Sequence, residues 1–296
     1  MNLLKMALED YIRTFEEITG KRFKNKPRMQ RLSRVALIKI ILRESSKFRL
    51  KLSREIYGNI KGPIYSRLSS FGNILLVLCM EPPAAFYYPK THTIFQPKID
   101  KKTPKYWDCL WHEMTHAWSH DAQKQPEVEF DPYEIDEERI VRTAFEEGLA
   151  QFTSDEMLTQ TGMDIPPRDD VYQEDFWHKV GRELSISLMY SRELNLQIRY
   201  RTDPNFVPPP DYESILKHNW EQERGKKIPF KEKKKYLTQI LYHYERINQF
   251  VHMAGYYYAI RTLGPLKDRD ASLSERIDYL LARVPTSINQ LFLVES

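Results

Sequence analysis

The confinement of β-forming sequence to one short stretch is the feature that most constrains the fold. Residues 72–100 hold a continuous apolar run at 73–80, followed by two runs rich in β-forming residues, AAFYYP and HTIFQP. The prolines of this stretch exclude a long central strand, so at least one of the runs is expected at a sheet edge. Helical patterns precede and follow the stretch, which favours an α+β fold over alternating βαβ units.

Helical periodicity accounts for most of the remaining chain. The expected helices span residues 1–18, 103–122, 137–160, 173–195, 236–264 and 271–283. Two basic segments are interpreted as solvated surface, residues 22–34 as a linker and helix face and residues 224–235 as a loop and helix start. We expect an N-terminal subdomain, residues 1–125, with the small sheet, and a helical C-terminal subdomain, residues 126–296.

Composition is typical of a globular protein, with 41% hydrophobic and 29% charged residues in a chain of 296. The formal net charge of +4 is small for this length, and the basic segments lack a recognised binding motif, so no nucleic-acid partner is expected. The N-terminus lacks the pattern of a signal peptide, and the run 73–80 is too short to span a bilayer. These features predict a cytoplasmic protein without a membrane span, and they indicate no oligomeric state.

The stretch DCLWHEMTHAW, residues 108–118, carries the clearest chemical signal. On a helix, His112 and His116 lie one turn apart on one face, where two neutral imidazoles can bind one metal ion. Glu113 is rotated to the side, where its carboxylate can act as a general base toward a water at the metal. A chance H-E-x-x-H is expected in about one chain of this size in a hundred. The pattern therefore favours a site for one Zn²⁺ over a helix that carries two histidines for packing.

The motif HEMTH, residues 112–116, resembles the active-site helix of the zincin metallopeptidases. Within that superfamily the metzincin branch is disfavoured, because Ser119 and Ala122 stand where its glycine and third histidine are expected. His120 lies one turn beyond His116, but three successive histidines on a straight helix cannot converge on one ion. His120 is therefore interpreted as a helix-end imidazole.

The segment AFEEGLAQF, residues 144–152, resembles the second helix of the gluzincins, in which a glutamate before a glycine is the third zinc ligand. This resemblance implies Glu147 as the ligand, with Glu146 as the alternative, and close packing at Gly148 against the HEMTH helix. Gln151 stands where thermolysin-like members carry an aspartate, so the thermolysin branch itself is disfavoured.

The resemblance implies a zincin-like fold, in which a small mixed sheet with an edge strand and the active-site helix precede a mostly helical part. It also implies a zinc-dependent metallopeptidase that hydrolyses a peptide or protein substrate. The β-rich segment 84–97 then binds substrate as an added strand, although a simple core hairpin is equally consistent with it. A zinc hydrolase acting on a non-peptide amide or ester is the alternative, as is an inactive zincin-fold interaction protein, which the intact Glu113 argues against.

A donor for the oxyanion is sought in NQFVHMAGYYYAI, residues 248–260. His252 occupies the position at which aminopeptidase-like gluzincins carry a tyrosine three residues before a helical glycine, and thermolysin-like enzymes use histidine for this role. The resemblance therefore implies His252 as a catalytic residue. Tyr256 and Tyr257 are competing candidates, and a tyrosine-rich packed helix without a catalytic role is as consistent with the sequence.

Overall fold

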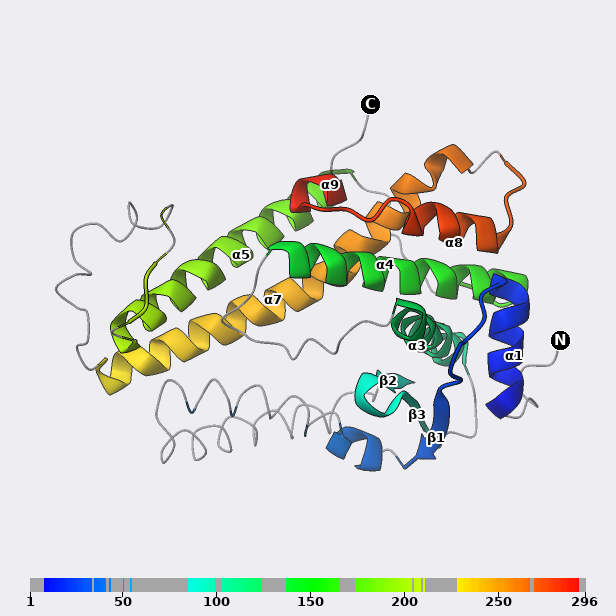
Figure 1. Cartoon of the computed structure of the whole chain (residues 1–296), viewed down its shortest axis with the longest axis horizontal. Helices are drawn as coiled ribbons and strands as arrows, with labels where there is room; N and C mark the ends of the chain where they lie inside the picture. Colours follow the sequence, from blue (N-terminus) through cyan, green and yellow to red (C-terminus); the bar gives the residue numbers. More distant parts are fainter. Residues whose placement is uncertain are drawn as a thin grey trace.

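The computed structural model describes residues 8–33, 35–40, 85–98, 103–123, 137–165, 174–203, 205–208, 228–266 and 269–292, with single residues 43, 50, 54 and 210 (Figure 1). Its elements are α1 (Leu8–Thr19), β1 (Arg28–Leu32), β2 (Phe86–Tyr88), η2 (Pro89–Thr91), β3 (Thr93–Pro97), α3 (Pro104–Gln123), α4 (Glu137–Gln160), α5 (Glu174–Thr202), α7 (Phe230–Thr262), η5 (Gly264–Leu266), α8 (Leu273–Leu281) and α9 (Ile288–Phe292). The fold is mixed α+β and mostly helical, as the distribution of periodicities predicts. The apolar run 73–80 lies outside the described residues.

The sheet has three strands in the order β1-β3-β2, with β1 parallel and β2 antiparallel to β3. The two β-rich runs form β2 and β3, joined through η2, so the predicted hairpin is confirmed. The interpretation of residues 22–34 as a linker and helix face is wrong, because Arg28–Leu32 form β1. Only Met29 and Leu32 of β1 are half-buried and the other three residues are exposed, so the strand carries little apolar alternation. Backbone pairing with β3 forms it instead.

Helix α3 begins where the sequence predicts and is held by a buried apolar face. Pro104 stands at its first position, and the Tyr106 N–H donates to Thr103 Oγ1 at 3.4 Å. Leu110, Met114 and Ala117 have no exposed surface, which places one side of α3 in the core. The opposite, half-buried side presents the HEMTH histidines, so burial of one face fixes the direction of the other.

Helix α4 is the centre of the helical layer and packs against α1, α3, α7, α8 and α9. In Figure 1 it crosses α7, while α5 runs antiparallel along α7. At the crossing, a Cβ on Gly148 would lie 2.0 Å from Gly255 O, and a Cβ on Gly255 would lie 1.6 Å from Ala144 O. The two backbones therefore touch, and only glycine fits at either position. Gly148 is thus packed against α7, not against α3 as expected.

One hydrophobic core joins the two halves of the chain. It contains Tyr11, Trp107 and Met114 from the predicted N-terminal subdomain and Leu149 and Ile277 from the predicted C-terminal one. The division at residue 125 stays a prediction. Among the described residues, no helix combines the length and apolar character that crossing a membrane requires.

Candidate metal centre

Two histidines of α3 and one glutamate of α4 converge on one point. His112 Nε2 lies 3.0 Å and His116 Nε2 lies 3.2 Å from Glu147 Oε2, and the two Nε2 atoms are 3.0 Å apart. Helical spacing places the histidines on one face of α3, and the packing of α4 on α3 brings Glu147 to that face. The structure therefore brings together the three residues that the sequence indicates as metal ligands.

These three side chains form a group that could hold a metal ion, because their ligand atoms all lie within 4.8 Å of one another. Bonds of about 2.0–2.1 Å to a tetrahedral zinc place neighbouring ligand atoms about 3.3 Å apart, close to the separations at this site. Two imidazole nitrogens and one carboxylate oxygen also leave a fourth position open, as in hydrolytic zinc sites. Each side chain keeps 15–20% of its surface exposed, so solvent can reach the group.

The charges of the cluster shift the pKa values of its members in opposite directions. Burial opposes ionisation of Glu147, but His116 and the hydrogen bonds from three imidazoles outweigh it and hold the pKa of Glu147 well below its usual range. Burial likewise favours neutral His116, but the charge of Glu147 outweighs it and raises the pKa of His116 to about 9. A metal ion at this point would replace a proton, because metal ligands must be deprotonated.

Glu113 lies beside the ligands, with its carboxylate turned toward the sheet. The Tyr87 N–H of β2 donates to Glu113 Oε2 at 2.8 Å. Burial raises the pKa of Glu113, against the lowering effects of His116, His112 and the Tyr87 N–H. A raised pKa suits a group that must both accept and release a proton. Strand addition at this edge stays a prediction, and it could not use the Tyr87 N–H, which Glu113 already occupies.

A hollow of about 300 Å³ opens over these residues. Its walls come from β2, α3, α4 and α7 and include Phe86, Tyr87 and Glu146 besides the metal-site residues. Glu146, the alternative ligand, lies outside the converging group and pairs with Arg142 one turn earlier at 3.2 Å. The geometry therefore favours Glu147 over Glu146 as the third ligand.

The candidates for oxyanion donor separate in space. His252 lines the hollow, its side chain is 57% exposed, and its Nδ1 lies 2.7 Å from Glu147 Oε2. Tyr256 is buried and its hydroxyl donates to Asp155 of α4. Tyr257 stacks on Phe292 of α9. Of the three, only His252 is among the described residues that line the hollow.

A polar network one helical turn from the ligands joins α3 to α4. Gln151 Nε2 donates to Asp108 Oδ1 at 2.9 Å, and Ser154 Oγ donates to the same oxygen at 2.8 Å. Asp108 precedes His112 by one turn, and Gln151 follows Glu147 by one turn. The glutamine at the position of the thermolysin-like aspartate therefore binds a carboxylate on α3, and the two helices are fixed next to the site.

Sequence reasoning missed Tyr87 and His92. The Tyr87 hydroxyl lies 2.9 Å from His92 Nδ1 and 3.1 Å from His120 Nδ1. The signal available was a tyrosine and a histidine flanking a predicted hairpin break directly before a metal-binding helix. His120 lies outside the converging group, as predicted, but it lines the hollow and contacts Tyr87.

Comparison with known proteins does not assign the chain to a family. No family model matches the chain, and no curated protein or solved structure is significantly similar to it.

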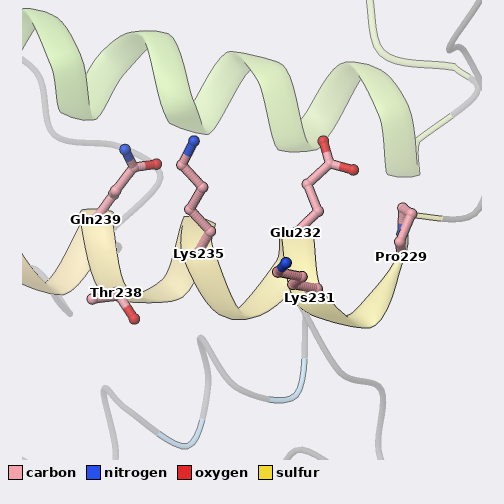
Figure 2. A pocket seen from close by; sticks show the side chains of 6 residues that line it. All are labelled: Pro229, Lys231, Glu232, Lys235, Thr238 and Gln239. Carbon is pink, nitrogen blue, oxygen red and sulfur yellow. The ribbon is translucent and has the colours of Figure 1, made fainter.

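A second, larger hollow of about 800 Å³ lies along the first turns of α7 (Figure 2). Its described lining includes Lys231, Lys235 and Gln239, and Glu232 forms an ion pair with Arg201 of α5. Figure 2 shows Glu232 and Lys235 turned toward α5 and Thr238 turned away from it. These side chains present no converging metal ligands among the described residues, so the hollow is no second candidate centre.

Proposed function

We propose that the protein is a zinc-dependent metallopeptidase of gluzincin type. The observation that carries this proposal is the convergence of His112, His116 and Glu147 next to a half-buried glutamate that is not one of the converging group. A site that served only to bind metal would have no use for Glu113 at this place. The small sheet in front of the metal helix and the helical second half are consistent with a zincin-like fold.

Glu113 is the general base of the proposed reaction. When bound, zinc would supply a Lewis acid that polarises the scissile carbonyl and lowers the pKa of an attacking water. Glu113 accepts the proton of that water on its carboxylate and passes it to the departing amine nitrogen. Its raised pKa favours the first transfer, since a strongly acidic carboxyl would be a poor proton acceptor.

The experiment that tests the function is a digest of a mixed peptide library by the zinc-loaded protein, read by mass spectrometry. We expect new peptide termini that disappear with a chelator and return with added zinc. Cleavage that persists in the chelator would contradict the proposal. An intact library combined with chelator-sensitive hydrolysis of amide or ester compounds would replace the peptidase by a non-peptide hydrolase, and inertness toward both would leave an interaction protein.

Glu147 and Glu146 provide a matched pair for the metal site. Glu147→Ala removes one of the three proposed ligands, so we expect zinc affinity to fall by at least about 100-fold. Loss of a residue that only hydrogen-bonds a ligand already costs about 10–100-fold, and loss of a ligand should cost no less. Glu146→Ala removes the neighbouring carboxylate, which pairs with Arg142, and should leave affinity within about threefold, since a half-exposed i,i+4 pair contributes little. Competition titration with a zinc-sensitive dye measures both. Reversed affinities would assign the third ligand to Glu146.

His252 and Tyr256 differ in what their loss should change. His252 is placed to donate to the developing oxyanion, so His252→Gln should lower kcat by about 100-fold while the protein stays as stable as wild type. Tyr256→Phe leaves Asp155 buried with one donor fewer, so it should lower the free energy of unfolding by about 1–3 kcal/mol and leave kcat unchanged. Steady-state kinetics and urea unfolding separate the two. The opposite pattern would make Tyr256 the oxyanion donor.

A further inference from the structure

A chain of hydrogen bonds, closed into a ring by the backbone of α3, runs through Tyr87 and His120, two residues that line the hollow with Glu113. His120 Nδ1 and His92 Nδ1 both contact the Tyr87 hydroxyl, at 3.1 and 2.9 Å. His92 Nε2 lies 2.7 Å from Asn25 O, and the Asn25 N–H and side-chain amide donate to Asp121 at 2.9 and 2.8 Å. Asp121 is the neighbour of His120 on α3, so the ring returns to the helix on which it began.

The hydrogens of this ring have one consistent arrangement for neutral histidines. Asn25 O can only accept, so His92 Nε2 carries the hydrogen and His92 Nδ1 accepts from the Tyr87 hydroxyl. The Tyr87 oxygen then accepts from His120 Nδ1–H. His120 Nε2 is left as a lone pair, and among the described residues this buried atom has no hydrogen-bond partner. In this arrangement the unsatisfied group at His120 Nε2 is an acceptor lone pair and not an N–H donor.

The backbone at His92 adopts a left-handed conformation at the end of η2. His92 has φ +47°, in the left-handed region that costs a non-glycine residue energy. Its N–H donates to Pro89 O and its O accepts from the Arg28 N–H, so backbone bonds on both sides hold the turn. The imidazole of His92 contacts the Tyr87 hydroxyl, which His120 of α3 also contacts.

We infer that Tyr87 is a positioning residue for Glu113, an inference that rests on the proposed function. Tyr87 is 6% exposed, and its hydroxyl is clamped between a histidine of α3 and one of the hairpin. The same residue gives its backbone N–H to Glu113 Oε2. The two hydrogen bonds to the hydroxyl hold the Tyr87 side chain, and so its backbone N–H, in place. This N–H in turn holds the Glu113 carboxylate, which accepts the proton in the proposed reaction.

Tyr87→Phe removes the clamp and keeps the N–H, and Tyr88→Phe is the matched control, because successive residues of a strand point to opposite faces. In the zinc-loaded protein we expect Tyr87→Phe to lower kcat by about 10-fold with KM within about twofold, the size of one lost buried hydrogen bond. Tyr88→Phe should have the kinetics of wild type. If the wild type is active and Tyr87→Phe has the same kcat as wild type, the inference is overturned.

A second measurement uses the zinc-free protein and needs no activity. The amide proton at position 87 should resonate downfield in wild type and shift upfield in both Glu113→Gln and Tyr87→Phe, since each weakens its bond to the carboxylate. His120 should be the Nδ1–H tautomer in wild type and lose that form in Tyr87→Phe, while His92 stays Nε2–H. An amide shift that Tyr87→Phe leaves unchanged would contradict positioning whether or not the protein is a peptidase. If the wild type has no hydrolytic activity, the proposed function is contradicted, but the amide shift at position 87 and the His120 tautomer still test the positioning by Tyr87.

His92→Asn separates positioning from stability, because asparagine tolerates the left-handed backbone but cannot bridge Asn25 and Tyr87. We expect the same fall in kcat and the same upfield amide shift as in Tyr87→Phe. Wild-type values of both in a folded His92→Asn protein would contradict the inference.

Discussion

Replacing Glu113 by glutamine is expected to abolish hydrolysis while zinc stays bound. Glutamine has nearly the volume of glutamate and can still contact the Tyr87 N–H through its carbonyl oxygen, so the α3 face keeps its shape. It cannot accept a proton from water, and the loss of a general acid–base group costs about 10²–10⁴ in rate. We expect kcat/KM to fall by about 10³ or more, because one group handles the proton in both directions.

Zinc content, measured by inductively coupled plasma mass spectrometry, shows whether the loss of activity comes from loss of the general base or from loss of the metal. Glu113 is not a ligand in the proposed site, so the variant should carry the same one zinc per chain as wild type. Retained zinc with activity within about tenfold of wild type would contradict the role of Glu113, since such a loss lies below the range for acid–base catalysis. Loss of zinc together with activity would place Glu113 among the ligands instead.

Adding one methyl group at the crossing of α4 and α7 is expected to destabilise the protein strongly. The Cβ of Gly148→Ala would lie 2.0 Å from a backbone oxygen, and that of Gly255→Ala would lie 1.6 Å from one. Both contacts are with backbone, so the helices must separate instead of a side chain rotating away. We expect each variant to lose at least about 3 kcal/mol of unfolding free energy, at the upper end for overpacking.

Gly264→Ala is the control for this prediction. Nothing lies within 4 Å of a Cβ at Gly264, so its unfolding free energy should change by less than about 0.5 kcal/mol. Urea unfolding followed by far-ultraviolet circular dichroism measures all three variants. If Gly148→Ala were as stable as Gly264→Ala, direct contact between the backbones of α4 and α7 would be contradicted.

The crossing also places part of the site. Gly148 follows Glu147 on α4, and Gly255 comes one turn after His252 on α7. Direct contact of the two glycines therefore places Glu147 Oε2 and His252 Nδ1 2.7 Å apart. A variant that folds with the helices further apart should lose the His252 contact before it loses the α3 histidines, because those lie on the other neighbour of α4.

The elements that the sequence predicts best are those whose own periodicity determines them. Residues 137–160 form α4 with the expected bounds, since apolar positions such as Ala144 and Leu149 recur at helical spacing and are buried. The helix expected at 173–195 continues as α5 to Thr202, because its packing along α7 extends beyond the clear apolar pattern. Helix ends that depend on a neighbour are therefore less predictable than helix centres.

Strand β1 could not be predicted because its stabilising partner is far away in sequence. Its residues, RMQRL, alternate poorly, and the strand exists through parallel pairing of Met29 with Ile94 and its neighbours. The partner of Gly148 was misassigned for a related reason. A glycine on a helix indicates a close approach, but nothing local indicates which of two helices makes it.

The candidate metal site was predictable to the extent that it follows from helical spacing and from a resemblance between short motifs. His112 and His116 are fixed by four residues of helix, whereas Glu147 depended on the resemblance of EEGLAQF to the gluzincin helix. The ring joins three separate segments, which are the stretch at Asn25, the β2–β3 hairpin and α3, so no spacing in the sequence could indicate it.

Zinc-edge anomalous diffraction from crystals of the zinc-loaded protein tests the central claim most directly. The account predicts one strong peak within about 2.0–2.2 Å of His112 Nε2, His116 Nε2 and a Glu147 carboxylate oxygen, with Glu113 outside that distance. A peak elsewhere, or one ligated by Glu113 or Glu146 in place of Glu147, would contradict it.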